Sequence, residues 1–111
     1  MRVETREAGN VVVLSLYGNI RTNEDYAAFK EAMDGLIEKG KARIVLNFKE
    51  VHFINSSGLG RLVLAAKKLK ELNGALSIVH LSDDLKELFL FTRLDSKIPI
   101  FQTEDDAIAS L

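Results

Sequence analysis

The chain has 111 residues, enough for a single domain, and its 47% hydrophobic and 28% charged residues are typical of a globular protein. The formal net charge of −1 gives no electrostatic reason to expect a nucleic acid or an acidic membrane as the main partner. Cysteine is absent, which excludes a disulfide, a thiolate metal site and a cysteine nucleophile. Because the sequence shows no secretory signal and no apolar run of roughly 18 residues, we expect a cytoplasmic protein without a membrane span.

The first part of the chain is expected to form a hairpin and then a helix. Residues 11–17 begin with β-branched side chains and then alternate, which is typical of a strand, and residues 3–8 precede them across a Gly-Asn turn. Thr22 is expected to cap the following helix, with Asp25 as its capping-box partner. Apolar side chains recur at helical spacing after this cap, and Gly40 marks the end of the helix.

The rest of the chain continues the alternation. The expected order is a strand over 44–48, a helix from near Ser57 to residues 73–74, a strand over 75–81, a helix capped by Ser82, an edge strand over 98–101 and a helix from near Thr103. The continuous apolar run that opens the first of these strands indicates a central strand covered on both faces. We therefore predict a single domain over residues 1–111, an α/β sandwich with a mixed sheet of four to five strands and about four α-helices.

The run Leu88-Phe89-Leu90-Phe91 leaves two alternatives open. If Leu88 and Phe89 face the core, helical geometry turns Leu90 and Leu94 towards the other side. This turn of helix is then either buried at the helix end or part of a patch that binds a partner.

The segment 51–62 joins an apolar strand to an amphipathic helix and holds the candidate site. Two adjacent hydroxyls, Ser56 and Ser57, and two glycines, Gly58 and Gly60, lie at the expected N-terminus of the helix. The first N–H groups of a helix lack internal partners, and the aligned peptide dipoles make this end partly positive. Such an end accepts an anion, including a phosphate placed on one of its own serines.

A second loop is expected beside this segment. Loops that leave the carboxyl ends of parallel strands gather at one edge of a sheet, so loop 18–23 should lie next to loop 49–56. Arg21 in the first loop and Arg61, four residues after Ser57, would make this corner basic and favourable for an anion.

The same residues have plainer structural explanations. Serines are good helix caps, the arginines can be solvated charges, and the glycines either give flexibility or allow a close approach of a partner or of neighbouring backbone. The two histidines, His52 and His80, lie on different elements without an organised acid cluster, so no metal site is expected. No phosphate-binding loop, nucleophile elbow or complete dinucleotide fingerprint is present, so we do not expect an enzyme.

Residues 55–60 read Asn-Ser-Ser-Gly-Leu-Gly and resemble the switch motif of the STAS family, in particular that of bacterial anti-sigma factor antagonists. Those proteins read Asp-Ser-Ser-Gly-Leu-Gly or Asp-Ser-Ala-Gly-Leu-Gly at this point. The turn over residues 18–20 is similar to the Gly-Glu-Leu/Ile-Asp turn of the family, with Arg21 in place of the final acid. Chain length and element order also follow the family, so the resemblance implies one STAS domain with a STAS-like sandwich fold.

The resemblance implies a partner-switching cycle. The unmodified protein would bind an anti-sigma factor, usually a serine kinase with a histidine-kinase-like ATP fold, and so free a sigma factor. That kinase would phosphorylate the switch serine, Ser56 or in the alternative Ser57, and a serine phosphatase would reset it. ATP and magnesium belong to the kinase in this scheme, so no cofactor is expected here. The residues implied in partner binding are Arg21, Asn55, Ser57, Gly58, Leu59, Gly60 and Arg61.

Two departures from the family pattern remove negative charge near the phosphoacceptor. Asn55 and Arg21 each stand where relatives carry an acid. These changes either alter which kinase recognises the protein or leave the switch unphosphorylated. The alternatives are therefore a constitutive STAS interaction module of a transporter or signalling complex, and a STAS domain that binds a small anion or nucleotide at the same loops.

Overall fold

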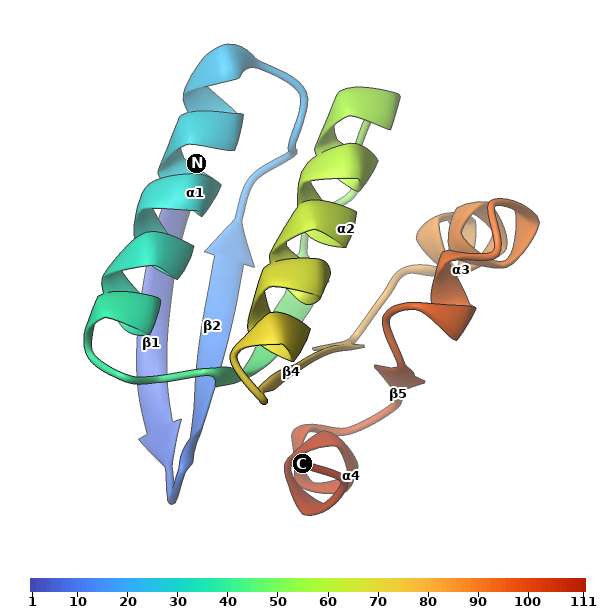
Figure 1. Cartoon of the computed structure of the whole chain (residues 1–111). Coiled ribbons are helices and arrows are strands. Elements are labelled where there is room, and N and C mark those ends of the chain that lie inside the picture. Colours follow the sequence, from blue (N-terminus) through green and yellow to red (C-terminus); the bar gives the residue numbers. More distant parts are fainter.

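A computed structural model describes all residues, 1–111, and shows a mixed five-stranded sheet with helices on both of its faces (Figure 1). The elements are β1 (Arg2–Ala8), β2 (Val11–Tyr17), α1 (Asn23–Glu38), β3 (Arg43–Glu50), α2 (Ser56–Glu71), β4 (Ala75–Val79), α3 (Asp83–Phe91), a 3₁₀ turn (Leu94–Ser96), β5 (Ile100–Phe101) and α4 (Glu104–Ala109). The strands lie in chain order, with β1 antiparallel to β2 and every later pair parallel. The predicted α/β class, the mixed sheet and the four helices are confirmed.

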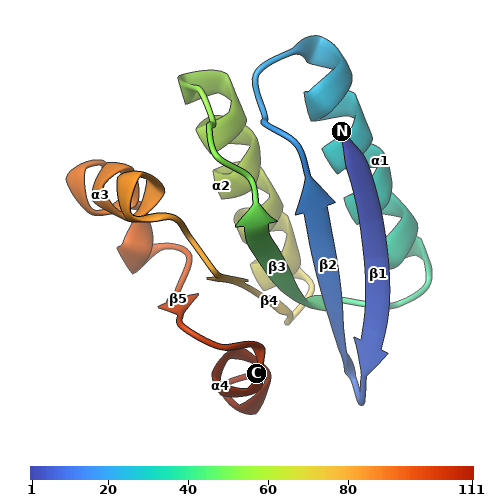
Figure 2. The same cartoon turned by 180° about the vertical axis from the view of Figure 1, so that it is seen from behind.

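The two faces of the sheet carry separate cores. The larger core lies under α1, α2 and α3 and contains Leu14, Leu46 and Phe48, all fully buried. The smaller core lies on the opposite face, where Ala107 of α4 packs with a few valines that include Val45 (Figure 2). Right-handed crossovers between parallel strands place α1, α2 and α3 on one face, whereas α4 follows the edge strand β5 and reaches the other. As predicted, β3 is covered on both faces.

Local capping sets most of the helix starts. The Thr22 hydroxyl accepts from the Asp25 N–H while the Asp25 carboxylate accepts from the Thr22 N–H, which is the predicted capping box. Ser82 and Thr103 cap α3 and α4 through their hydroxyls alone, each accepting from a backbone N–H three residues further on.

The region around α3 differs from the expectation. β4 ends at Val79, two residues early, because His80 adopts a left-handed backbone conformation. A 3₁₀ turn that was not predicted follows α3 and buries Leu94, in agreement with the alternative of a buried helix end. Leu90 and Phe91 are 59% and 88% exposed. The apolar run is thus divided between the two alternatives, with Phe89 buried and Leu90 and Phe91 on the surface. None of the helices in the structure is both long and apolar enough to cross a membrane.

Candidate functional site

The pairing of β2 with β3 continues into the loops that follow these strands. The Gly18 N–H donates to the carbonyl of Glu50 (3.2 Å), and the Ile20 N–H donates to that of Phe53 (3.0 Å). The Asn55 N–H donates in turn to the carbonyl of Ile20 (3.2 Å). The prediction that loops 18–23 and 49–56 are neighbours is therefore confirmed, and backbone hydrogen bonds join them up to the start of α2.

Asn19 holds the two loops together through its side chain. Its Oδ1 accepts from the backbone N–H groups of His52 (3.0 Å) and Phe53 (3.1 Å). Sequence reasoning missed this role. The available signal was an asparagine directly after a glycine in a turn, since asparagine side chains often satisfy backbone groups at such positions.

Helix α2 begins at Ser56, one residue earlier than expected, and Asn55 rather than a serine is its N-cap. The Asn55 Oδ1 accepts from the Gly58 N–H (2.9 Å) and from the Tyr26 hydroxyl (2.8 Å). The Asn55 Nδ2 donates to the carbonyl of Arg21 (3.1 Å). The amide therefore uses both its donor and its acceptor, and it ties α2 to α1 and to the β2–α1 loop.

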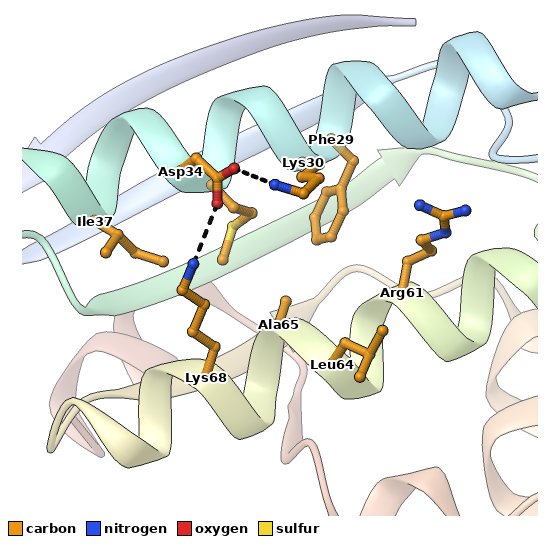
Figure 3. Close-up of a pocket in the computed structure, with 9 residues that line it drawn as sticks. Phe29, Lys30, Asp34, Ile37, Arg61, Leu64, Ala65 and Lys68 are labelled. Carbon is orange, nitrogen blue, oxygen red and sulfur yellow. Dashed lines mark hydrogen bonds and ion pairs between the residues drawn. The ribbon is translucent and has the colours of Figure 1, made fainter.

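Tyr26 and Arg61 form a second connection between α1 and α2. The Tyr26 side chain is 6% exposed, and its hydroxyl reaches Asn55. The Arg61 guanidinium lies 4.8 Å from the centre of the Tyr26 ring, a cation–π arrangement, and extends from α2 towards α1 (Figure 3). The sequence placed Tyr26 only in an apolar stripe, although a buried tyrosine hydroxyl normally needs a polar partner.

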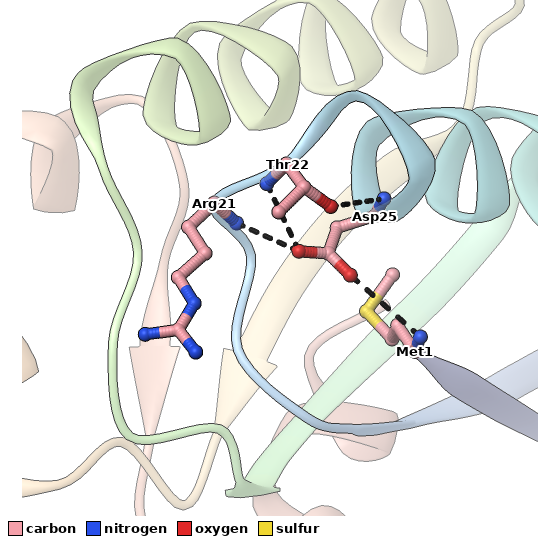
Figure 4. A network of polar contacts seen from close by, with 4 residues as sticks. All are labelled: Met1, Arg21, Thr22 and Asp25. Carbon is pink, nitrogen blue, oxygen red and sulfur yellow. Dashed lines mark hydrogen bonds and ion pairs between the residues drawn. The ribbon is translucent and has the colours of Figure 1, made fainter.

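The backbone of Arg21 takes part in the hydrogen bonds of this corner. The N–H groups of Arg21 and Thr22 each donate to the Asp25 carboxylate at 3.0 Å. The Arg21 bond is the main reason why the pKa of Asp25 lies below its usual value, and the Thr22 hydroxyl and N–H act in the same direction. The Arg21 side chain runs beside the loop that leads into α2 (Figure 4).

The residues predicted for the site fall into an exposed and a buried group. Ser56, Ser57, Gly60 and Arg61 are exposed at the start of α2. Gly58 and Leu59 are buried, so they position this surface rather than form it. Arg21 is exposed and Asn55 is half-buried at its edge. Arg21 and Arg61 line two separate hollows, one beside Asp25 and one between α1 and α2.

The two glycines of α2 have different explanations. A Cβ atom at Gly58 would lie 2.6 Å from Cγ1 of Ile54 and 3.0 Å from Cγ2 of Ile20. Only a residue without a side chain lets the helix approach these loop side chains so closely. A Cβ atom at Gly60 would meet nothing within 4 Å. The close approach therefore involves neighbouring parts of the chain at Gly58, whereas Gly60 leaves open surface.

The fold and this surface define a small α/β sandwich in which two hydrogen-bonded loops hold the exposed N-terminus of a helix. The chain belongs to the STAS domain family, whose model matches residues 2–107. In sequence it is 30% identical over 74 residues to BtrV of Bordetella bronchiseptica, a candidate anti-sigma factor antagonist. This match covers 67% of the chain and 64% of BtrV, which is less than two thirds of that relative's length.

Solved structures share the fold. One is a candidate anti-sigma factor antagonist of Thermotoga maritima, with a TM-score of 0.89 and 24% identity over 97% of this chain and 92% of that chain. Another is the Bacillus cell fate determinant SpoIIAA in its phosphorylated form, with a TM-score of 0.73 and 22% identity over 98% of each chain. At these identities the likeness establishes the fold and its element order.

Proposed function

We propose that this protein is an anti-sigma factor antagonist whose binding is switched off by phosphorylation of Ser56. The observation that carries the proposal is an exposed serine at the first position of α2, on a helix end held by Asn19, Asn55 and Tyr26. The names of BtrV and of the Thermotoga protein support the partner class, and the phosphorylated form of SpoIIAA supports the switch.

The helix end favours a phosphate on Ser56. Phosphorylation adds a charge of about −1.5 to −2 at pH 7. The N–H groups of Ser56 and Ser57 have no intrahelical partner, and the positive end of the helix dipole stabilises a nearby anion by roughly 0.3–1 kcal/mol. Asn55 is neutral, so no carboxylate at the cap repels the phosphate. The modified protein should therefore keep its fold.

Loss of binding then requires no large rearrangement of this chain. Ser56, Ser57 and Gly60 form a small, uncharged surface next to Arg61. A partner that fits this surface meets a bulky, hydrated dianion after phosphorylation, and its contact residues lose their fit. The buried Gly58 and Leu59 act by holding the exposed residues in place.

The chemistry of the cycle belongs to the partners in this proposal. A serine kinase, the anti-sigma factor itself, supplies ATP and magnesium and transfers the phosphate, and a serine phosphatase removes it. This chain binds and is modified, and no catalytic step is assigned to its residues.

The test uses the anti-sigma factor serine kinase from the organism that encodes this chain. After incubation with the kinase and ATP, mass spectrometry should place the phosphate on Ser56. Ser56→Ala should bind the partner permanently, and Ser56→Asp should bind it poorly. Ser57→Ala is the matched control, because it removes the adjacent exposed hydroxyl, and it should still be phosphorylated and released.

Two outcomes would contradict the proposal in different ways. Phosphate on Ser57 in place of Ser56 would move the switch by one residue. Binding without phosphate on either serine would make the protein a constitutive interaction module, as in the transporter or signalling alternative.

A further inference from the structure

An apolar groove lies between α1 and α2 and opens to the surface beside the candidate site. Its volume is about 150 Å³. Figure 3 shows Phe29 and Ile37 entering it from α1 and Ala65 pointing toward it from α2, with Leu64 beside Ala65 at the edge. Arg61 lies at one end, so the groove is continuous with the exposed start of α2. The residues that line it are Phe29, Lys30, Met33, Asp34, Ile37, Arg61, Leu64, Ala65 and Lys68.

The rim of the groove is positively charged. Three cations and one carboxylate line it. Asp34 is shared between Lys30 (2.5 Å) and Lys68 (3.6 Å), and these contacts bridge α1 and α2. Arg61 has no carboxylate partner and rests on the Tyr26 ring. The rim therefore complements an acidic group, and Arg61 is the cation that remains available to it.

The volume of the groove indicates what kind of group can occupy it. Sites for small molecules and cofactors usually measure roughly 300–1,000 Å³, about twice this volume or more. A cavity of about 150 Å³ holds a molecule the size of benzene. An α-helix with its side chains is about 10–12 Å wide, so a hollow of this volume holds a single side chain and not a whole helix. One large apolar side chain from another protein fits.

The exposed side chain of Leu64 supports a protein occupant. Leu64 is 65% exposed and lies at the edge of the groove, one turn along α2 from Gly60. A large apolar side chain at the edge of a pocket is typical of a protein interface, where anchor residues enter pockets and nearby contacts exclude water.

We propose that the α1–α2 groove is the anchor pocket of the partner interface, receiving one large apolar side chain of the anti-sigma factor beside a partner carboxylate that pairs with Arg61. This inference rests on the proposed function for the identity of the partner. It extends the contact surface from the start of α2 to Lys68, about three turns along the helix from Ser56.

The first test needs no partner, because the chain has only two methionines. Met33 lines the groove and Met1 does not. Phenylacetate is an aromatic ring that carries a carboxylate. When it is titrated into protein labelled with methyl-¹³C-methionine, the NMR signal of the Met33 methyl group should shift and that of Met1 should not. Arg61→Gln should weaken this binding. If the Met33 signal does not shift at tens of millimolar phenylacetate, the proposal that this groove is a binding pocket is wrong.

The second test measures affinity for the anti-sigma factor by calorimetry. Ala65→Phe fills the groove and Leu64→Ser removes the apolar edge, so each should weaken binding about tenfold or more. Leu72→Ser, at the C-cap of α2, is the matched control, since Leu72 is 48% exposed but does not line the groove. Its affinity for the anti-sigma factor should lie within about twofold of that of the wild type. Denaturant midpoints show that each variant folds.

The outcomes separate this inference from the proposed function. If the wild type binds the anti-sigma factor and Leu64→Ser and Ala65→Phe bind equally well, the anchor pocket is wrong and the proposed function stands. If the wild type does not bind it, the proposed function fails and the assignment of this pocket to that partner fails with it.

Discussion

Replacing the two glycines of α2 by alanine, one at a time, tests whether the helix start is pressed against the loops beneath it. Gly58 and Gly60 lie two residues apart at the start of the same helix. The gain in helix propensity from alanine is therefore similar at both positions, at most about 1 kcal/mol. The difference between the two variants isolates the effect of what the added methyl group meets.

The structure sets the size of that difference. At Gly58 the methyl carbon would lie 2.6 Å from an Ile54 carbon and 3.0 Å from an Ile20 carbon, which is too close for either contact. Ile54 is 3% exposed and Ile20 is 1% exposed, so neither side chain can move into solvent. Overpacking of this kind costs about 1–3 kcal/mol. At Gly60 the methyl group is unobstructed. We expect Gly58→Ala to be about 1–3 kcal/mol less stable than Gly60→Ala.

Guanidinium unfolding followed by circular dichroism gives the free energy of unfolding of both variants and the wild type, provided that the m-values agree. Gly60→Ala should match or exceed the wild type, and Gly58→Ala should fall below Gly60→Ala. Equal stabilities of the two variants would refute the close approach of α2 to the loop side chains. Binding adds a second comparison, because Gly60→Ala places a methyl group on the proposed partner surface and should weaken binding without loss of stability.

Three further predictions follow from single side chains. Asn55→Asp should keep the fold but lower the free energy of unfolding by about 1 kcal/mol, because the acid loses the bond to the Arg21 carbonyl and faces it with an oxygen. Unchanged stability in denaturant unfolding would show that this bond contributes nothing. Ser77→Ala should raise the free energy of unfolding by about 1 kcal/mol, since the buried Ser77 hydroxyl has no hydrogen-bond partner; a loss in the same assay would reveal a partner such as a buried water. The pKa of Asp25 is lowered in the folded protein, so its stabilising effect is present above the unfolded pKa and is lost as the pH falls through the folded pKa. The stability difference between wild type and Asp25→Asn should therefore be largest near pH 7 and shrink below about pH 4, and a difference independent of pH would contradict this account.

Local signals in the sequence determined the order and the type of the elements. The β-branched run of β2, the continuous apolar start of β3 and the caps Thr22, Ser82 and Thr103 each act within a few residues, so they can be read from the sequence alone. The position of the site followed as well, because parallel strands bring the loops after β2 and β3 to one edge of the sheet. The element boundaries predicted on either side of α3 were less accurate, because the left-handed conformations of His80 and Arg93 have no clear sequence signal.

Only the tertiary structure decided what each residue of the site does. Asn55 looked like a change in the charge of a motif, yet its side chain links Tyr26, Gly58 and the Arg21 carbonyl. Arg61 was expected at the corner with Arg21, and it rests on Tyr26 at the end of a groove. Tyr26 and Asn55 are 29 residues apart in the chain. Contacts of this kind depend on how closely two helices and two loops pack against one sheet, which helical spacing and loop composition do not specify.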